Sequence, residues 1–315
     1  MIDKTALICG VSGQDGSYLA KFLLAKGYRV WGSSRDAQGS KFSNLDRLGV
    51  KAEIQLISMV PEDFRSVLVA LKESQPDEVY YLAGQSSVGL SFEQPAETIQ
   101  SIAIGTLNIL EACRMMDKKI RIYQAGSSEC FGDTDGRPAN ERTPFHPRSP
   151  YAVAKASAFW LVDNYREAYS LFVCTGILYN HESRLRPERF VTQKIVSTAK
   201  RIASGSAEKL ILGRLDIARD WGWAPEYVEA MWLMLQQDQA EDFVIATGEA
   251  NTLESFVAEA FNQLNLDWKD HVEQDQQFMR PTDLLISRGD PTKAKQKLNW
   301  QAQYRMKDVI EMMMK

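Results

Sequence analysis

The chain has few of the residues that build disulfide frameworks or metal sites. Its 315 residues include only four cysteines and three histidines. The cysteines are widely spaced without a CxxC pair, and the histidines are isolated; these residues are Cys9, Cys113, Cys130, Cys174, His146, His181 and His271. We therefore expect free structural thiols, a location in the cytosol, and no structural or catalytic metal ion.

The chain also lacks a charge excess, low-complexity segments and long apolar runs. Its 41 acidic and 37 basic residues give a net charge of −4, which argues against a large basic surface for nucleic acid. With 19 glycines, 11 prolines and 44% hydrophobic residues, it resembles an ordinary globular protein. No stretch approaches the roughly 18 apolar residues of a membrane span, and the opening MIDKTALICG lacks the long apolar region of a signal peptide. We expect neither nucleic-acid binding nor membrane attachment.

Short apolar segments alternate with helical patterns over the first 180 residues. Strands are predicted at residues 5–9, 29–32, 54–59, 78–82, 120–125 and 172–179, with helices between them that include 61–74, 98–116 and 149–168. This order predicts an α/β fold, a Rossmann-type doubly wound parallel sheet.

The pattern becomes less regular after Asn180, where we expect the single sheet to end. Helices are predicted at 190–203, 225–235, 253–264 and 306–314, with one strand at 243–247. We therefore predict a dinucleotide-binding domain over residues 1–180 and a smaller, mixed substrate lobe over 181–315 that is interleaved with it.

A glycine-rich segment follows the first predicted strand. Gly10, Gly13 and Gly16 form G-x-x-G-x-x-G at the start of the first helix. Backbone amides and the positive end of a helix can approach a pyrophosphate there, because no Cβ atom intervenes. We interpret the segment as a dinucleotide-binding loop, the alternative being a tight structural turn. At the end of the second strand, Arg35 favours NADP because it could accept a 2′-phosphate, although Asp36 follows it and Arg35 could also be an ordinary surface arginine.

Tyr151 and Lys155 form a Y-x-x-x-K pair in the helix that Ser149 and Pro150 are expected to start. Residues four apart lie on one helix face, so the Lys155 ammonium is expected beside the phenol. A nearby cation should lower the phenol's pKa from about 10 and make Tyr151 an acid–base group. The alternative is an ordinary surface pair.

Ser127 and Glu129 follow the strand at 120–125 and therefore lie at the carboxyl edge of the predicted sheet. Open α/β sheets bind their ligands at this edge. With Tyr151 and Lys155, a hydroxyl and a carboxylate there would form an acid–base set. The alternative is a turn in which both side chains only cap the next element.

Long strings of the sequence resemble the extended short-chain dehydrogenase/reductase family and, within it, the GDP-mannose 4,6-dehydratases. The resemblance spans nearly the whole chain and includes GVSGQDGSYLAKFLLAKGY from Gly10, LAGQSSVGLSFEQP from Leu82, SSECFG from Ser127, TPFHPRSPYAVAKASAFW from Thr143, GILYNHES from Gly176 and ARDWG from Ala218. It implies an NADP-dependent lyase that converts GDP-mannose to GDP-4-keto-6-deoxymannose by internal hydride transfer and loss of water. The catalytic residues that it implies are Ser127, Glu129, Tyr151 and Lys155.

The resemblance also implies binding residues and an assembly. The cofactor-binding residues would be Gly10, Val11, Ser12, Gly13, Gln14, Asp15, Gly16, Arg35, Leu82, Ala83, Gly84, Gln85, Ser86, Lys155, His181 and Arg186. The nucleotide-sugar residues would be Asn180, Glu182, Lys194, Arg219 and Arg280, whose positive charges suit a diphosphate. Homodimers or homotetramers would form through paired helices, for which the apolar faces of residues 98–116 and 149–169 are candidates.

Several positions depart from the family pattern and keep other functions open. Ser127 stands where threonine is usual, and the other departures are Asp36, Ser58, Leu185, Trp223 and Asp283. The alternatives are a related GDP-hexose or GDP-heptose dehydratase, epimerase or reductase, and a non-catalytic NADP-binding sensor. Glu129 argues against a simple reductase, which needs no base at C5, and a sensor has no reason to keep Tyr151 and Lys155.

Overall fold

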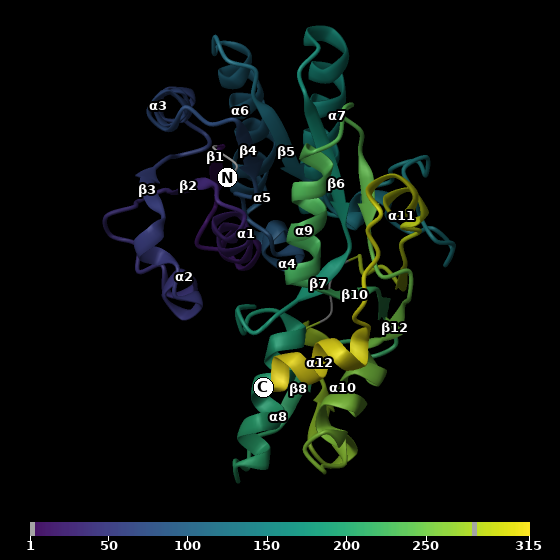
Figure 1. The fold of residues 1–315 in the computed structure, drawn as a ribbon. Helices are drawn as coiled ribbons and strands as arrows, with labels where there is room; N and C mark the ends of the chain where they lie inside the picture. Colours follow the sequence, from purple (N-terminus) through teal and green to yellow (C-terminus); the bar gives the residue numbers. More distant parts are fainter. Residues whose placement is uncertain (1–3, 279–281) are drawn as a thin grey trace.

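A seven-stranded parallel sheet is the centre of the computed structural model, which describes residues 4–278 and 282–315 (Figure 1). Its strands are β1 (Thr5–Cys9), β2 (Arg29–Ser34), β3 (Gln55–Ser58), β4 (Glu78–Tyr81), β5 (Arg121–Ala125), β6 (Val173–Leu178) and β11 (Phe243–Ile245). They lie in the order β11-β6-β5-β4-β1-β2-β3, and every neighbouring pair is parallel. The predicted doubly wound sheet is confirmed.

Helices cover both faces of this sheet. On one face lie α1 (Gln14–Ala25) and α9 (Ala224–Leu235), which are side by side in Figure 1, and on the other α3 (Phe64–Ser74), α6 (Gly105–Arg114) and α7 (Pro150–Tyr169). In β1, Ala6 and Ile8 pack on the first face, whereas Leu7 and Cys9 pack on the second. Burial of both faces explains why this strand is continuously apolar in the sequence.

The predicted helix at residues 98–116 is divided in the structure. It is composed of α5 (Pro95–Ile99), a π-helical turn at Gln100–Ile104 and α6, and the short helix α4 (Val88–Glu93) precedes it. The short helices α2 (Ser43–Leu48) and α11 (Thr292–Leu298) and the 3-10 turn Lys51–Glu53 were not predicted. Such short elements give too weak a periodic pattern to be recognised in the sequence.

The expectation that the sheet ends near Asn180 is wrong for one strand. β11 pairs in parallel with β6, through Phe243 opposite Gly176, and forms an edge of the main sheet. The helix before it, α9, packs on the same sheet. The chain thus leaves the sheet after β6 and returns to it more than sixty residues later, as β6 ends at Leu178 and β11 begins at Phe243. The division at residue 180 stays a prediction.

The remaining segments form a smaller lobe beyond the carboxyl ends of the strands (Figure 1). Its helices are α8 (Val191–Ala203), α10 (Leu253–Asn262) and α12 (Met306–Met314), which share an apolar cluster. Its short strands are β7 (Asn180–Glu182) with β10 (Trp221–Trp223), β9 (Ala218–Arg219) with β12 (Asn251–Thr252) and β14 (Ile286–Ser287), and β8 (Leu210–Leu212) with β13 (Val272–Gln274). The four helices predicted after residue 180 are confirmed, whereas these short strands were not foreseen.

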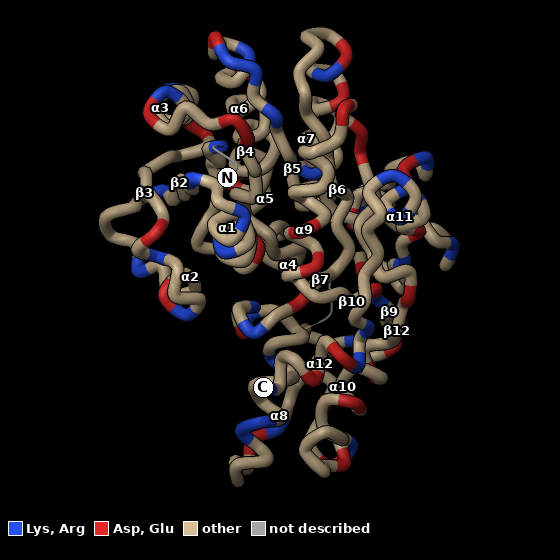
Figure 2. The backbone as a smooth tube through the Cα atoms, in the orientation of Figure 1, with Lys and Arg blue, Asp and Glu red and all other residues tan. Residues whose placement is uncertain are grey.

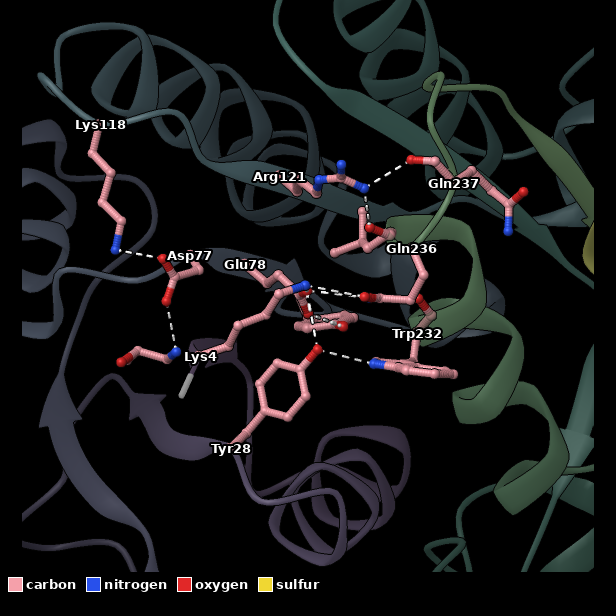
Figure 3. A network of polar contacts seen from close by, with 12 residues as sticks. Lys4, Tyr28, Asp77, Glu78, Lys118, Arg121, Trp232, Gln236 and Gln237 are labelled. Atoms are coloured by element: carbon pink, nitrogen blue, oxygen red, sulfur yellow. Dashed lines mark hydrogen bonds and ion pairs between the residues drawn. The ribbon is translucent and has the colours of Figure 1, made fainter. Parts of the chain in front are cut away.

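A polar network closes the opposite, amino-terminal edge of the sheet (Figure 3). Glu78 begins β4 and is completely buried. Its carboxylate accepts hydrogen bonds from Lys4 (2.9 Å), Tyr28 (3.1 Å), Tyr80 (2.7 Å) and Gln236 (3.1 Å). Because Gln236 follows α9, this network ties the end of α9 to the first strands of the sheet.

Charges of both signs are mixed along the backbone (Figure 2). The structure therefore shows acidic and basic side chains interleaved over the sheet and the smaller lobe alike. Within residues 4–278 and 282–315, no helix has the length and apolar content required to cross a membrane.

Candidate active site

The glycine loop lies between β1 and α1 at the centre of the sheet. Gly10 has a φ of +86°, and a Cβ atom there would lie 3.1 Å from the Cα of Ala83. At Gly16 a Cβ atom would lie 2.4 Å from the carbonyl oxygen of Gly10. Gly13 precedes α1 and provides no side-chain cap, so the helix presents its first amides to an anion. The loop has the form that a pyrophosphate requires.

Arg35 follows β2 and lies near this loop, since the carbonyl of Ser33 accepts the amide hydrogen of Gly10 at 3.2 Å. Its side chain is 61% exposed, and the guanidinium lies 3.3 Å from Glu97. The carboxylate of Asp36 instead accepts the backbone amides of residues 38 and 39, at 3.0 and 2.8 Å. Ser58, another departure from the family pattern, accepts the amide hydrogen of residue 37 at 3.0 Å. Asp36 and Ser58 therefore shape the loop around Arg35.

The segment Leu82, Ala83, Gly84, Gln85 and Ser86 follows β4, the strand next to β1. The strand order reverses between β1 and β4, and open α/β sheets bind ligands at such a switch point. The backbone amide of Gln85 donates to the hydroxyl of Ser101 at 3.3 Å, which fixes the loop against the π-helical turn. The structure thus places this predicted cofactor segment against the glycine loop.

Ser127 and Glu129 lie just beyond the carboxyl end of β5. The hydroxyl of Ser127 caps the 3-10 turn Ser128–Phe131 by accepting the amide hydrogen of Glu129 at 3.3 Å. The capping alternative is therefore realised, but the same hydroxyl also lies close enough to the Tyr151 phenol to lower its pKa. Glu129 is half-buried, and within residues 4–278 and 282–315 no hydrogen bond or ion pair engages its carboxylate. It remains available to a ligand.

Tyr151 and Lys155 lie on one buried face of α7. The hydroxyl of Ser149 caps the helix by accepting the amide hydrogen of Ala152 at 3.1 Å, and Pro150 is the first helical residue, as predicted. Lys155 Nζ lies 5.8 Å from the Tyr151 ring centroid and donates to the carbonyl of Ala125 at 2.6 Å. The pair is therefore buried, and the alternative of a surface pair is wrong.

The expected lowering of the Tyr151 pKa is also wrong for the protein alone. Burial raises the pKa of this phenol above 10, and hydrogen bonding to Ser127 and the charge of Arg186 oppose the rise only in part. Burial also lowers the pKa of Lys155 to about 8, so its positive charge is itself less stable. The ammonium is directed at a backbone carbonyl rather than at the phenol oxygen.

His181 and Asp15 join the glycine loop to β7. His181 Nε2 lies 2.9 Å from the Asp15 carboxylate, and Nδ1 lies 2.7 Å from the carbonyl oxygen of Tyr179. Burial alone would lower the pKa of His181, but the Asp15 carboxylate outweighs it and raises that pKa. Burial would likewise raise the pKa of Asp15, but His181 holds it below its ordinary value. The geometry favours a charged pair beside the loop.

Arg186 and Glu182 form an ion pair at 2.9 Å near the same residues. Glu182 is 1% exposed and also accepts the Thr192 hydroxyl hydrogen at 2.8 Å. The charge of Arg186 acts on Asp15, His181 and Tyr151, so it lies close to all three. The predicted substrate residue Glu182 thus holds the predicted cofactor residue Arg186, while Asn180 begins the same strand.

The remaining predicted substrate residues belong to the smaller lobe. Arg219 is buried and lies 3.0 Å from Asp283, a position that departs from the family pattern. Lys194 donates to the carbonyl of Ile211 at 2.7 Å and lies 4.4 Å from the ring centroid of Phe278, and burial lowers its pKa. Arg280 lies outside the described residues.

Three buried residues of this region were missed in the sequence. Ser183 donates to the side chain of Gln14 at 2.8 Å, and the Tyr227 ring stacks on His181 with centroids 4.5 Å apart. Asp220 is fully buried and accepts hydrogen bonds from the backbone and hydroxyl of Thr247. Burial raises the pKa of Asp220 to about 6, although these hydrogen bonds oppose the rise. Ser183 and Asp220 lie within the strings NHES and ARDWG, which was the available signal.

Two further positions depart from the family pattern, Leu185 and Trp223. Leu185 is buried, and Trp223 immediately precedes α9. Within residues 4–278 and 282–315, no group of three histidine, cysteine, aspartate or glutamate side chains is arranged to hold a metal ion.

Comparison with known proteins gives one consistent family. A family described as GDP-mannose 4,6 dehydratase matches residues 7–313. GDP-mannose 4,6 dehydratase 2 of Arabidopsis thaliana is 47% identical over 98% of this chain and 86% of its own length. The human GDP-mannose 4,6 dehydratase is 41% identical over 98% of this chain and 90% of its own length.

Solved structures share the fold at lower identity. The dTDP-glucose 4,6-dehydratase of Bacillus anthracis, in complex with NAD, has a TM-score of 0.85 at 19% identity and covers 98% of this chain and 95% of its own. RMD of Pseudomonas aeruginosa, complexed with NADPH, has a TM-score of 0.81 at 22% identity and covers 99% of this chain and 97% of its own. The fold and the sequence agree, and the chain belongs to the GDP-mannose 4,6-dehydratase family of enzymes.

Proposed function

We propose that the enzyme converts GDP-mannose to GDP-4-keto-6-deoxymannose, using NADP as a resident cofactor. One observation carries the proposal: Ser127, Glu129, Tyr151 and Lys155 come together at the carboxyl edge of the sheet, beside the glycine loop. Family membership fixes the reaction class, and this cluster supplies groups for both an oxidation and an elimination.

The residues fit a dinucleotide cofactor. Gly10 allows the close backbone approach, and the start of α1 faces the loop without a side-chain cap. NADP rather than NAD is favoured because Arg35 is exposed at the end of β2, whereas Asp36 is held by two backbone amides of its own loop. The P. aeruginosa neighbour contains NADPH and the B. anthracis neighbour contains NAD, so these structures do not distinguish the two cofactors. The preference for NADP therefore rests on the residues near Arg35.

When bound, the cofactor would supply a reversible hydride acceptor at C4 of the sugar. Tyr151 takes the proton of the C4 hydroxyl, and the Ser127 hydroxyl, which lies beside the phenol, can position the C4 oxygen by donating a hydrogen bond to it. Ser127 and Arg186 are the groups that counteract burial and stabilise the phenolate. Lys155 is anchored to the carbonyl of Ala125 and places a cation next to the phenol ring.

Glu129 performs the elimination. Formation of a 4-ketone acidifies the neighbouring C5 proton, which the free carboxylate of Glu129 can remove. The same group then donates a proton to the departing C6 hydroxyl, which leaves as water. The unsaturated ketone that results needs a hydride at C6 and a proton at C5. The bound cofactor would supply the hydride, and Tyr151 returns to C5 the proton that it took from the C4 hydroxyl, so the sugar loses one water without net oxidation. Glu129 is the residue that distinguishes this reaction from a simple reduction.

The GDP part of the substrate would lie against the smaller lobe. A diphosphate carries negative charge that Lys194 and Arg219 can offset, and Arg219 can use its fixed guanidinium geometry. Arg280 is assigned to the same role by its position in the sequence. Asn180 and Glu182 lie on β7, which follows β6 of the main sheet and pairs with β10.

We also infer a homodimer or homotetramer. Large apolar side chains are exposed on the outer surfaces of the candidate helices: Ile104 (41%), Met115 (56%), Val153 (43%), Trp160 (58%) and Tyr169 (49%). Apolar surface of this kind marks interaction sites. The four cysteines are free and buried, which favours a reducing compartment such as the cytosol. Light scattering tests the assembly: a monomer at working concentrations would contradict it.

The reaction is tested by mass spectrometry of the nucleotide sugar after incubation with GDP-mannose and a trace of NADP. The expected product has lost one water, NADPH does not accumulate, and Glu129→Gln abolishes the change. Stoichiometric NADPH would contradict the proposal and favour a dehydrogenase. If GDP-mannose is unchanged but another GDP-hexose or GDP-heptose loses water, that other sugar becomes the proposed substrate.

A further inference from the structure

The side chain of Gln14 is used within the protein. Gln14 begins α1 and is 6% exposed. Its amide nitrogen donates to the carbonyl of His181 at 3.1 Å and to the Asp15 carboxylate at 3.0 Å, and its oxygen accepts the Ser183 hydroxyl hydrogen at 2.8 Å. Both donor hydrogens and the acceptor are therefore engaged. Gln14 connects the glycine loop to β7 and has no unused donor for a cofactor.

Neighbouring residues reinforce this connection. The Asp15 carboxylate lies 2.9 Å from His181 Nε2, and the Ser183 hydroxyl accepts the amide hydrogen of Leu185 at 3.1 Å. Ser183 is fully buried and His181 is 7% exposed. The first two residues of α1, directly after the glycine loop, thus contact His181 in β7 and Ser183 just after it. We name these four residues, Gln14, Asp15, His181 and Ser183, the loop–strand link.

The remaining side chains of β7, those of Asn180 and Glu182, point to the opposite side of the strand. Successive side chains of a strand point to opposite sides. Glu182 lies between His181 and Ser183, and its carboxylate contacts Arg186 and Thr192. Asn180 has the same parity as Glu182. One side of β7 therefore meets the glycine loop, while the other carries residues assigned to the nucleotide sugar.

We propose that the loop–strand link couples the binding of the two ligands, with Gln14 and Ser183 as its positioning residues. This inference rests on the proposed function. A dinucleotide that orders the glycine loop also orders Gln14 and Asp15. These two residues then fix the backbone at His181 and Ser183. A fixed backbone there sets the positions of the neighbouring side chains, Asn180 and Glu182. GDP then binds a site whose ordering has already occurred. The coupling is reciprocal, so GDP raises the affinity for NADP by the same factor.

The test is a set of calorimetric titrations on the full chain. The dissociation constant of GDP is measured with saturating NADP and without it, and the ratio of the two values reports the coupling. We expect a ratio of about five or more for the unmodified protein, the lower end of ordinary couplings. Ser183→Ala and Gln14→Met should each reduce the ratio to less than about two, because both remove the hydrogen bond between Gln14 and Ser183, and Gln14→Met also removes the one to the His181 carbonyl.

The double variant separates the link from two independent effects. If Gln14 and Ser183 act through one contact, Gln14→Met combined with Ser183→Ala gives the same ratio as either single change. Ser17→Ala is the matched control, because its buried hydroxyl bonds to the carbonyl of Val11 within the same loop and not to β7. It should keep the ratio of the unmodified protein. Gln14→Met provides an independent test if Ser183→Ala fails to fold.

Turnover of GDP-mannose on the same protein separates the two proposals. A ratio near one in the unmodified protein, or full coupling in both single variants, would overturn the link while turnover upholds the proposed function. A protein that binds NADP but neither binds GDP nor converts GDP-mannose would overturn both. Coupling that is lost in Ser183→Ala and Gln14→Met but kept in Ser17→Ala would support the link.

Discussion

The two edges of the main sheet use buried charge differently. At the amino-terminal edge, Glu78 is fully buried and its carboxylate accepts four hydrogen bonds (Figure 3). At the carboxyl edge, Glu129 is half-buried, and no partner within the described residues engages its carboxylate. Satisfied polar groups stabilise a structure, whereas unsatisfied or perturbed groups cluster where ligands bind. The first edge therefore has the features of a stabilising network, and the second has the features that the proposed site requires.

A second pair of charged side chains, one at each edge of the sheet, shows the same contrast between paired and unpaired charge. Asp77 accepts the backbone amide of Thr5 at 2.8 Å and pairs with Lys118 at 2.7 Å, so both of its oxygens are used. Lys155, by comparison, is buried without an acidic partner within hydrogen-bond range in the described part of the chain, and burial lowers its pKa to about 8. Such a cation is costly to hold. The catalytic role proposed for Lys155 would account for its presence.

The largest expected effect is on catalysis at the carboxyl edge. Glu129→Gln should lower kcat for loss of water by about 10²–10⁴-fold, the ordinary contribution of a general acid–base group. Because no hydrogen bond or ion pair within the described residues engages this carboxylate, the free energy of unfolding should change by less than about 0.5 kcal/mol. Steady-state kinetics and urea unfolding measure both. A variant with near-normal kcat would remove Glu129 from the mechanism.

The converse change acts at the amino-terminal edge. Glu78→Ala removes the acceptor of four donors and should lower the free energy of unfolding by about 3–5 kcal/mol, as when one member of a buried network is deleted. The kcat of the folded fraction should stay within about twofold, since the network lies at the edge opposite the catalytic residues. A large loss of kcat without a loss of stability would break the distinction between the edges.

A smaller effect is expected at the end of β2. Arg35→Ala should weaken NADP binding by about 10- to 100-fold, the worth of one or two hydrogen bonds to a charged group, and should leave NAD binding unchanged. Titration with each cofactor measures this selectivity. Arg65→Ala, an exposed arginine on α3, is the control and should bind both cofactors normally. Equal losses for NAD and NADP would show that Arg35 shapes the loop without reading a phosphate.

The smallest effect is a dependence of stability on pH. The pKa of His181 is raised in the folded protein, so its contribution is fully present below its unfolded value near 6.5 and is lost as pH rises through the folded value. Each unit of that rise corresponds to about 1.4 kcal/mol. Lys155, whose pKa is lowered to about 8, acts in the opposite direction over part of this range, so the test is a difference. Urea unfolding from pH 6 to 9 should show that the stability advantage of the unmodified protein over His181→Gln shrinks as pH rises. His146→Gln is the control and should keep the pH dependence of the unmodified protein.

Features that depend on residues close together in the chain could be predicted from the sequence. The continuous apolar character of β1 reflects burial on both faces, and the glycine spacing reflects the close approach of Gly10 to Ala83. The start of α7 at Ser149 and Pro150 is likewise a local matter of capping. These features identified the fold and brought Ser127, Tyr151 and Lys155 into one proposed site.

Features that depend on distant contacts could not be predicted in this way. Gln14 and Ser183 are 169 positions apart, and no local pattern joins them. The return of β11 to the sheet depends on its pairing with β6 across an intervening lobe. The raised pKa of Tyr151 depends on burial, whereas the Y-x-x-x-K spacing specifies only that a cation lies on the same helix face. Burial and pairing are properties of the whole fold.

The central claim is that the catalytic cluster carries out an internal oxidation, elimination and reduction on one sugar. It is tested most directly with GDP-mannose deuterated at C4, unlabelled NADP and analysis of the product by NMR. The account predicts a product that has lost water and carries the deuterium at C6, with none released to the free cofactor pool. Deuterium that accumulates in released NADPH, or a product without deuterium at C6, would contradict it.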